Sequence, residues 1–135
     1  MAFHLNERLA AGGFDFGTTG ICRVLLKDNA LFPWFILVPE VDESITELHQ
    51  LEAADYASVC FTIRQLSGFV QSHFQPDKLN VAAIGNIVPQ LHIHIVARSP
   101  GDPAWPGVVW GCSEKRNYGK EEALAIHEAY LQSLA

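Results

Sequence analysis

The sequence predicts an α+β domain in which an antiparallel sheet carries helices packed on one side. Three observations lead to this prediction. Residues 21–27 and 32–39 have the composition of two strands, and a turn signal separates them. Residues 90–97 alternate between polar and apolar side chains, which is the period of a strand with two different faces. Residues 53–72 instead repeat apolar side chains at helical spacing. Strands and helices in separate stretches are typical of the α+β class.

The N-terminal part predicts a short helix followed by a hairpin. Residues 7–13 favour a helix that ends at Gly12 and Gly13, where glycine can adopt a left-handed cap conformation. The strand at 32–39 is a continuous apolar run bounded by prolines. Such a run favours a central strand covered on both faces, or aromatic residues that line a pocket at its start.

The middle of the chain predicts two helices. Ser44 with Glu47 three residues later forms a capping-box pattern, so we expect a short helix up to about residue 50. The longer helix at 53–72 should end at the Gln-Pro-Asp sequence of residues 75–77. Its buried stripe is expected to comprise Val59, Ile63, Leu66 and Val70.

The remaining elements follow in order. Residues 78–84 predict a strand, residues 85–89 a loop, and residues 90–97 the next strand. A last helix is expected at 120–134. Its expected packing positions are Leu124, Ala125, Tyr130 and Leu131.

Length and composition narrow the class of protein. A chain of 135 residues suits a single domain spanning residues 1–135. The charge count, 9 basic minus 15 acidic residues, gives −6, which disfavours a nucleic acid polymer as partner but permits a single nucleotide. Three widely spaced cysteines disfavour structural zinc and disulfides. With no bilayer-length apolar run and no signal-type N-terminus, we expect a cytoplasmic protein without a membrane partner.

Residues 90–98 carry the strongest functional signal. The alternation places Gln90, His92 and His94 on one face of the strand and leaves the other face to enter a core. Neutral imidazole can act as nucleophile, acid, base or metal ligand near neutral pH. Both flanks are rich in glycine and proline, and loops at strand ends are where sites are commonly assembled.

This stretch resembles the signature of the histidine triad (HIT) superfamily of nucleotide hydrolases and transferases. The signature is three alternating histidines, each followed by an apolar residue, and here Gln90 stands at the first position. The resemblance covers about residues 22–110 and includes the strand and loop at 80–86. It implies a HIT-like fold, a homodimer whose sheets join across a two-fold axis, and attack on the α-phosphate of an adenosine nucleotide through a covalent nucleotidyl-histidine. No cofactor is implied.

The resemblance also implies roles for the three polar residues. His92 is expected to be the nucleophile, with its other ring nitrogen held by a backbone carbonyl, for which residues 87–89 are the nearest source. His94 is expected to bind phosphate oxygens. Gln90 departs from the family pattern, because an amide cannot transfer a proton, although it can orient His92 or bind phosphate. Trp34 is a second departure, since several HIT hydrolases carry histidine at that position.

Other residues are candidates for substrate binding, each with a structural alternative. Asn86 is expected at a phosphate or leaving group, or as a turn residue. Asn29 is expected at a ribose, or in a plain hairpin turn. Phe32 and Trp34 are expected to wall a base pocket, or to belong to the core. Two further candidates lie beyond the triad strand, with Arg98 expected at a phosphate or in solvent and Trp105 in a segment folded over the site.

Two rival functions remain open on the sequence. Alternating histidines on a strand can ligate zinc, but zinc needs further ligands and nothing in the sequence places one beside His92, so we expect no metal. The second rival is a nucleotide-binding module without catalysis, which Gln90 and Trp34 both permit. Turnover measured against affinity for adenosine phosphates would separate this binding module from an enzyme.

Overall fold

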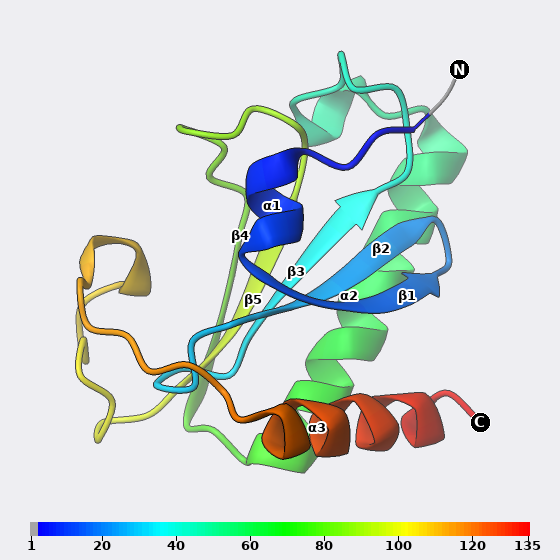
Figure 1. The fold of residues 1–135 in the computed structure, drawn as a ribbon. Helices are drawn as coiled ribbons and strands as arrows, with labels where there is room; N and C mark the ends of the chain where they lie inside the picture. Colours follow the sequence, from blue (N-terminus) through cyan, green and yellow to red (C-terminus); the bar gives the residue numbers. More distant parts are fainter. Residues whose placement is uncertain (1–2) are drawn as a thin grey trace.

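The computed structural model describes residues 3–135, which fold around one five-stranded antiparallel sheet (Figure 1). The strand order is β1-β2-β3-β5-β4, so β3 lies at the centre between β2 and β5, and β1 and β4 lie at the edges. The strands are β1 (Gly13–Thr19), β2 (Cys22–Lys27), β3 (Trp34–Pro39), β4 (Lys78–Ala82) and β5 (Ile93–Arg98). The predicted α+β class with an antiparallel sheet is confirmed.

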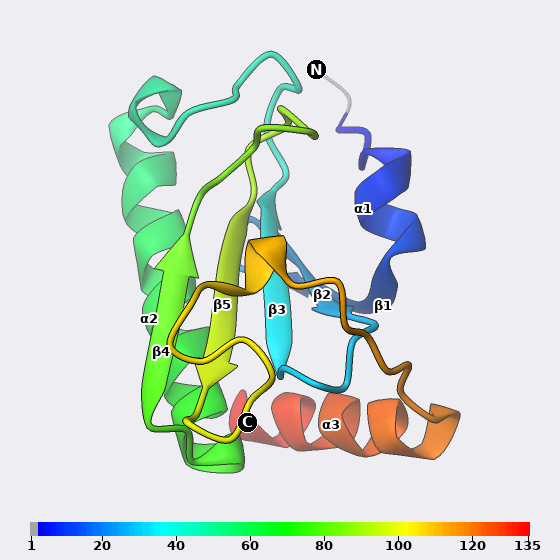
Figure 2. The same cartoon turned by 90° about the vertical axis from the view of Figure 1, so that its left-hand side faces the viewer.

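Three helices and two short 3-10 turns complete the fold. They are α1 (Glu7–Ala11), η1 (Leu48–Gln50), α2 (Ala53–Phe74), η2 (Val109–Gly111) and α3 (Lys120–Ser133). The two long helices, α2 and α3, pack on one face of the sheet as predicted, but α1 lies on the opposite face together with the segment that carries η2 (Figure 2). The expectation that all helices share one side is therefore wrong for α1.

Each face of the sheet buries its own apolar core. On the first face, alternate residues of β5 such as Ile93 and Ile95 pack against the α2 side chains Val59, Leu66 and Val70. On the second face, Trp34 and Ile36 of β3 pack with residues from α1 and η2. All six residues of β3 are buried. A strand covered on both faces must be apolar throughout, as its sequence indicated.

The edge strand β1 was not predicted from the sequence. It pairs with β2 from Gly13↔Lys27 to Thr19↔Cys22, with an irregular register between Asp15 and Thr18. Its glycines hide the strand pattern, since glycine disfavours strands. Gly13 is nevertheless required there, because an added Cβ would lie 2.3 Å from the carbonyl oxygen of Leu26.

Three local predictions are wrong. Ser44 does not cap a helix; the capping box is formed by Glu47 and Gln50 around η1. Gly12 ends α1 at φ −84°, outside the left-handed region. On α3 the buried residues are Ala123, Ile126 and Tyr130, whereas Leu124, Ala125 and Leu131 are exposed. Only Tyr130 was predicted correctly, because the helix packs through Ala123 and Ile126, the neighbours of the predicted Leu124 and Ala125.

Candidate functional site

The two histidines of the triad strand lie side by side on the second face of the sheet. His92 immediately precedes β5 and His94 is its second residue. Each is only 6% exposed, and their ring centroids are 4.9 Å apart. The intervening Ile93 points into the opposite core. The alternation predicted from the sequence is confirmed, and it gathers two imidazoles at one buried place.

A backbone carbonyl orients the ring of His92. Its Nδ1 lies 2.7 Å from the carbonyl oxygen of Gln90. A carbonyl can only accept, so Nδ1 carries the proton and the lone pair of the neutral ring resides on Nε2. A carbonyl partner was expected from the resemblance, but it comes from Gln90 rather than from residues 87–89.

His94 has the opposite arrangement. The indole Nε1–H of Trp34 donates a 2.9 Å hydrogen bond to His94 Nδ1. The register explains the contact, because β3 pairs with β5 and places Trp34 opposite Val96. Burial, and then the charges of His92 and Lys27, lower the pKa of His94 to about 3. His94 is therefore neutral at physiological pH, with its proton on Nε2.

A cleft of about 370 Å³ opens beside both histidines. Its walls come from α1, β2, β3, the loop before the triad strand and η2, and they comprise Arg8, Leu9, Lys27, Ile36, Ile84, Gly85, Asn86, Ile87, Val88, His92, His94 and Trp110. Asn86 lies in this cleft, as expected for a substrate-binding residue. None of these lining residues carries a carboxylate, while two carry positive charge.

The two cations, Arg8 and Lys27, were missed by sequence reasoning. The Nζ of Lys27 lies 4.8 Å from the centroid of the Trp34 ring. Its pKa is lowered by burial and by the nearby charge of Lys115. The hairpin contained a signal for Lys27, because an antiparallel partner of the strand at 32–39 runs in the opposite direction. With Leu26 paired with Phe35, Lys27 comes opposite Trp34. Nothing in the sequence pointed to Arg8, which depends on where α1 docks.

Comparisons with known proteins agree with this geometry. The model of the HIT domain family matches residues 14–101, which is more than half of the chain. This chain belongs to the HIT family. No curated protein matches it significantly.

Solved structures of bacterial HIT proteins are similar along the whole chain. A histidine triad protein from Marinobacter aquaeolei VT8 is 40% identical, with 100% of both chains covered and a TM-score of 0.93. One from Sinorhizobium meliloti 1021 is 36% identical, covers 97% of this chain and 96% of its own, and has a TM-score of 0.93. One from Bradyrhizobium japonicum is 34% identical, with 100% of both chains covered and a TM-score of 0.95.

In this HIT chain, the side chain of Gln90 does not line the cleft beside the histidines. Its Oε1 accepts a 2.8 Å hydrogen bond from the backbone N–H of Asn6, and its Nε2 donates a 2.8 Å bond to the carbonyl oxygen of His4. Each end of the amide therefore makes one hydrogen bond to the backbone. These bonds give Gln90 a structural role, in which it attaches the segment before α1 beside the triad, and its expected catalytic role stays a prediction.

Asn29 and Phe32 also lie away from the cleft. Asn29 is 6% exposed, and its Oδ1 accepts from the backbone N–H groups of Leu31 and Arg116 at 3.2 and 3.4 Å. Phe32 is fully buried in the second core. The structural alternatives, a turn residue and a core aromatic, are correct for these two positions. Trp34 is also a core residue, 5% exposed, but it reaches the site through its bond to His94.

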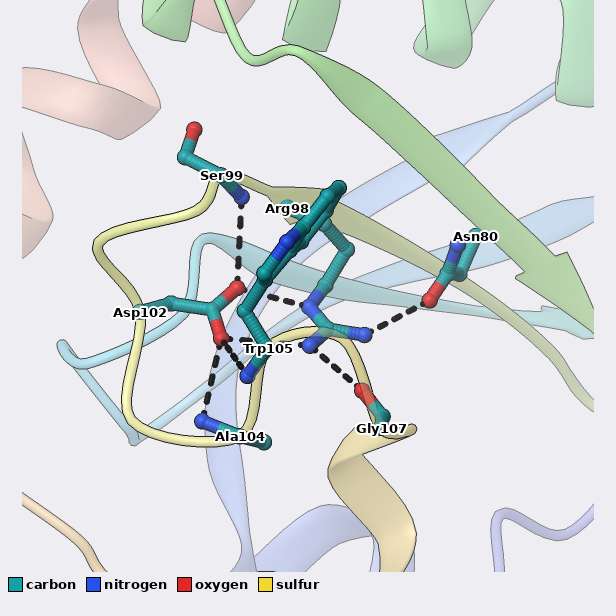
Figure 3. A network of polar contacts seen from close by, with 7 residues as sticks. All are labelled: Asn80, Arg98, Ser99, Asp102, Ala104, Trp105 and Gly107. Atoms are coloured by element: carbon teal, nitrogen blue, oxygen red, sulfur yellow. Dashed lines mark hydrogen bonds and ion pairs between the residues drawn. The ribbon is translucent and has the colours of Figure 1, made fainter.

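Arg98 and Trp105 belong to a separate polar network (Figure 3). Arg98 is 2% exposed and donates to Asp102 through Nε and Nη2, to Asn80 through Nη1 and to the carbonyl of Gly107 through Nη2. The hydrogen bond from Arg98 lowers the pKa of Asp102 to about 2. Four of the five N–H donors of Arg98 are used inside the protein and the residue is buried, so neither a phosphate contact nor an exposed position in solvent fits it.

The network shapes the segment between β5 and η2. The indole of Trp105 covers the guanidinium of Arg98, with 5.8 Å from Cζ to the ring centroid (Figure 3). It is Trp110, beyond this loop, that reaches the cleft, with its ring centroid 5.2 Å from that of His94. The segment expected to fold over the site was predicted correctly, but Trp110, not Trp105, contacts His94.

Across residues 3–135, no three His, Cys, Asp or Glu side chains come close enough to hold a metal ion together. No helix in the same range has the length and apolar character to cross a bilayer.

Proposed function

We propose that this protein binds a nucleotide in the cleft and transfers its nucleotidyl group through a covalent bond to His92 Nε2, as a hydrolase or a nucleotidyl transferase. The orientation of His92 carries the proposal. With Nδ1–H bound to the carbonyl of Gln90 at 2.7 Å, the ring keeps an unshared electron pair on Nε2. A neutral imidazole nitrogen held in this way is a nucleophile ready for attack on phosphorus.

The charges around the cleft support a phosphorylated ligand. Arg8 and Lys27 are the cations that line it, and no acidic side chain does. His94 adds a neutral Nε2–H donor next to the nucleophile, since Trp34 occupies its Nδ1. Donors fixed before the reaction stabilise the charge that develops on a phosphoryl oxygen. Asn86 and the backbone of its loop are available to the same anion.

The reaction would proceed in two displacements. In the first, the electron pair of His92 Nε2 forms a bond to the α-phosphorus, and the bond from phosphorus to the leaving group breaks with its electron pair. The nucleotidyl-imidazole is cationic and keeps its Nδ1–H bond to Gln90. In the second, the oxygen of water or of another acceptor attacks phosphorus, the P–N bond breaks, and the acceptor's proton passes to solvent.

For the nucleoside we propose adenosine. Leu9, Ile36 and Val88 give the cleft an apolar wall beside the histidines. A purine ring offers such a wall the largest apolar surface of the common bases. Apolar contacts discriminate weakly between bases, so the preference for adenine is expected to be modest.

We also propose that residues 1–135 act as one HIT domain. The matched segment ends before the whole site does, because Arg8 precedes residue 14 and Trp110 follows residue 101. The cleft therefore draws on both flanks of the matched region. A shortened chain limited to the matched residues would lack one cation and one aromatic wall.

A homodimer is proposed from the free edge of β4. The other edge strand, β1, is irregular between Asp15 and Thr18, which discourages pairing with a second sheet. β4 exposes Val81 (46%), and α2, which lies behind β4 in Figure 2, exposes Phe61 (64%). Pairing of β4 with its own copy across a two-fold axis would bury such side chains on both partners.

Intact-protein mass spectrometry tests the central proposal. The purified chain is mixed with nucleoside polyphosphates of different bases and quenched at short times. We expect a mass increase of one nucleotidyl group, largest with adenosine, and absent in His92→Ala. Nucleotide binding without any adduct or turnover would identify a binding module, and an adduct that persists in His92→Ala would place the chemistry elsewhere.

A further inference from the structure

Trp34 and His94 form the only tryptophan–histidine hydrogen bond recorded among the described residues. The donor and acceptor lie 2.9 Å apart, and the two residues are 5% and 6% exposed. Water therefore has little access to replace either partner. An indole N–H can donate but never accept. Its partner nitrogen must consequently be unprotonated for the bond to exist.

Two tryptophans contact the same imidazole, and only one of them bonds to it. The Trp34 and Trp110 ring centroids lie 5.7 and 5.2 Å from that of His94, both in edge-to-face geometry. Trp110 Nε1 is buried with no hydrogen-bond partner among the described residues. The aromatic packing around His94 is thus shared between the two, whereas the hydrogen bond belongs to Trp34.

The charged surroundings also oppose a proton on His94. His92 is its neighbour on the triad strand, Lys27 at the end of β2 faces the same space, and Arg8 of α1 lines the same cleft. No carboxylate lines that cleft to attract a proton back. A second proton on His94 would have to displace the Trp34 bond and stand in the same cleft as the charges of Lys27 and Arg8.

We propose that Trp34 is a positioning residue that holds His94 as one tautomer, with its proton on Nε2, so that His94 serves as a fixed hydrogen-bond donor and exchanges no proton during the reaction. The role of that donor rests on the nucleotidyl transfer proposed for His92. The tautomer itself does not, and it is measurable without any substrate.

The first experiment is a long-range proton–nitrogen NMR correlation on the ¹⁵N-labelled full chain, recorded across about pH 5 to 8. His94 resonances are assigned with His94→Gln. In the wild type we expect an unprotonated Nδ1, a protonated Nε2 and no titration over this range. A proton on Nδ1, or a titration midpoint near the ordinary value of histidine, overturns the inference without reference to activity.

Two variants separate the hydrogen bond from the packing. Trp34→Phe keeps an aromatic ring and removes the donor, so His94 should populate both tautomers and begin to titrate. Trp110→Phe makes the same change at a ring that contacts His94 without a hydrogen bond, so the tautomer and titration of His94 should stay as in the wild type. If both variants change His94 alike, packing fixes the ring and the proposal fails. If Trp34→Phe does not fold, the wild-type and Trp110→Phe spectra still decide.

Kinetics of the folded Trp34→Phe variant then test the consequence for the reaction. Loss of a fixed donor should lower kcat by about tenfold or more and change KM less. An unchanged kcat with a released tautomer contradicts the role assigned to the donor. A wild type with the expected tautomer but no nucleotidyl adduct would contradict the proposed function and leave the Trp34–His94 assignment standing.

Discussion

His92 and His94 are two residues apart, yet their hydrogen bonds give them opposite chemical characters. His92 Nδ1 meets an acceptor, the carbonyl of Gln90, and His94 Nδ1 meets a donor, the indole of Trp34. One ring therefore presents a lone pair and the other presents an N–H. The two rings therefore differ because the hydrogen-bond partner of each Nδ1 decides which ring nitrogen carries the proton.

Replacement of His92 by alanine should remove the activity and leave the fold intact. We expect hydrolysis of an activated adenosine phosphate to fall more than about tenfold, equivalent to about 1.4 kcal/mol of transition-state stabilisation. Steady-state kinetics with a circular dichroism check would measure this. His49→Ala, at an exposed histidine of η1, is the matched control and should keep the wild-type rate. A His92→Ala rate above a tenth of wild type argues against a nucleophile.

Burial of neutral His94 should make the protein less stable in acid. Its pKa is about 3 when folded, against an ordinary value of 6.5. Between these values the unfolded chain binds a proton that the folded chain does not, so the free energy of unfolding falls as pH decreases from 6.5 towards 3. The loss approaches about 1.4 kcal/mol per pH unit at most.

Urea unfolding of wild type and His94→Gln at several pH values between about 4 and 7 checks this sign. The glutamine can still accept from Trp34 but cannot titrate. The difference in unfolding free energy between the two proteins should therefore change with pH in this window. Asp102, whose own pH dependence begins near its ordinary pKa of 3.8 and extends down to about 2, is present in both proteins and cancels in the difference. Parallel curves would contradict a neutral buried His94.

At the residue scale, the alternating pattern placed His92 and His94 on one face and Leu91, Ile93 and Ile95 in the opposite core, although β5 itself begins only at Ile93. What it could not supply were partners distant in sequence. Gln90 forms hydrogen bonds to Asn6 and His4, which are separated from it by 84 and 86 positions in the sequence. Arg98 forms one to Asn80 on the neighbouring strand. A sequence does not show which polar side chains will have their hydrogen-bonding groups used inside the fold. The packing of other elements decides which of these side chains remain available to a ligand.

Among the elements, α1 depends on the triad for its position. Gln90 bonds to the backbone at His4 and Asn6, directly before the helix that brings Arg8 and Leu9 to the cleft. The first position of the triad is thus used to fix a wall of the site. An amide suits this task, since it donates and accepts at once.

Gln90→Ala should loosen that wall. Two partly buried hydrogen bonds are lost, so we expect a destabilisation of about 1–3 kcal/mol, faster amide exchange around Asn6, and a larger effect on KM than on kcat. Hydrogen exchange and steady-state kinetics measure these effects. Gln90→His tests the alternative role, because a residue that protonates the leaving group would change the dependence of rate on leaving-group basicity. We expect the same slope as in the wild type.

The elements were predictable where periodicity was strong. The long helix α2, the strands β2, β3 and β5, and the covered nature of β3 all follow from apolar patterns in their own residues. β1 was not predicted because glycines interrupt its pattern. The buried face of α3 was predicted wrongly because Leu124 and Leu131 are apolar yet exposed. Local periodicity predicts an element, but the face that it buries depends on the partner.

For the whole molecule, the free edge of β4 predicts a dimer. Light scattering at micromolar concentration should give about twice the chain mass of 14.9 kDa. Val81→Lys puts a charge on the exposed edge and should yield monomers. Leu131→Lys changes a comparably exposed residue of α3, 50% against 46%, and should leave the dimer intact. A wild-type mass that stays monomeric as concentration rises contradicts the proposal.

The placement of the tryptophans has a practical consequence. All three in the chain lie on the cleft side of the sheet: Trp34 and Trp110 beside His94, and Trp105 over Arg98 in the adjoining loop. The opposite core contains none of them. Intrinsic fluorescence of this protein is consequently a native optical probe of the cleft, so ligand titrations can be followed without a dye, label or coupled assay.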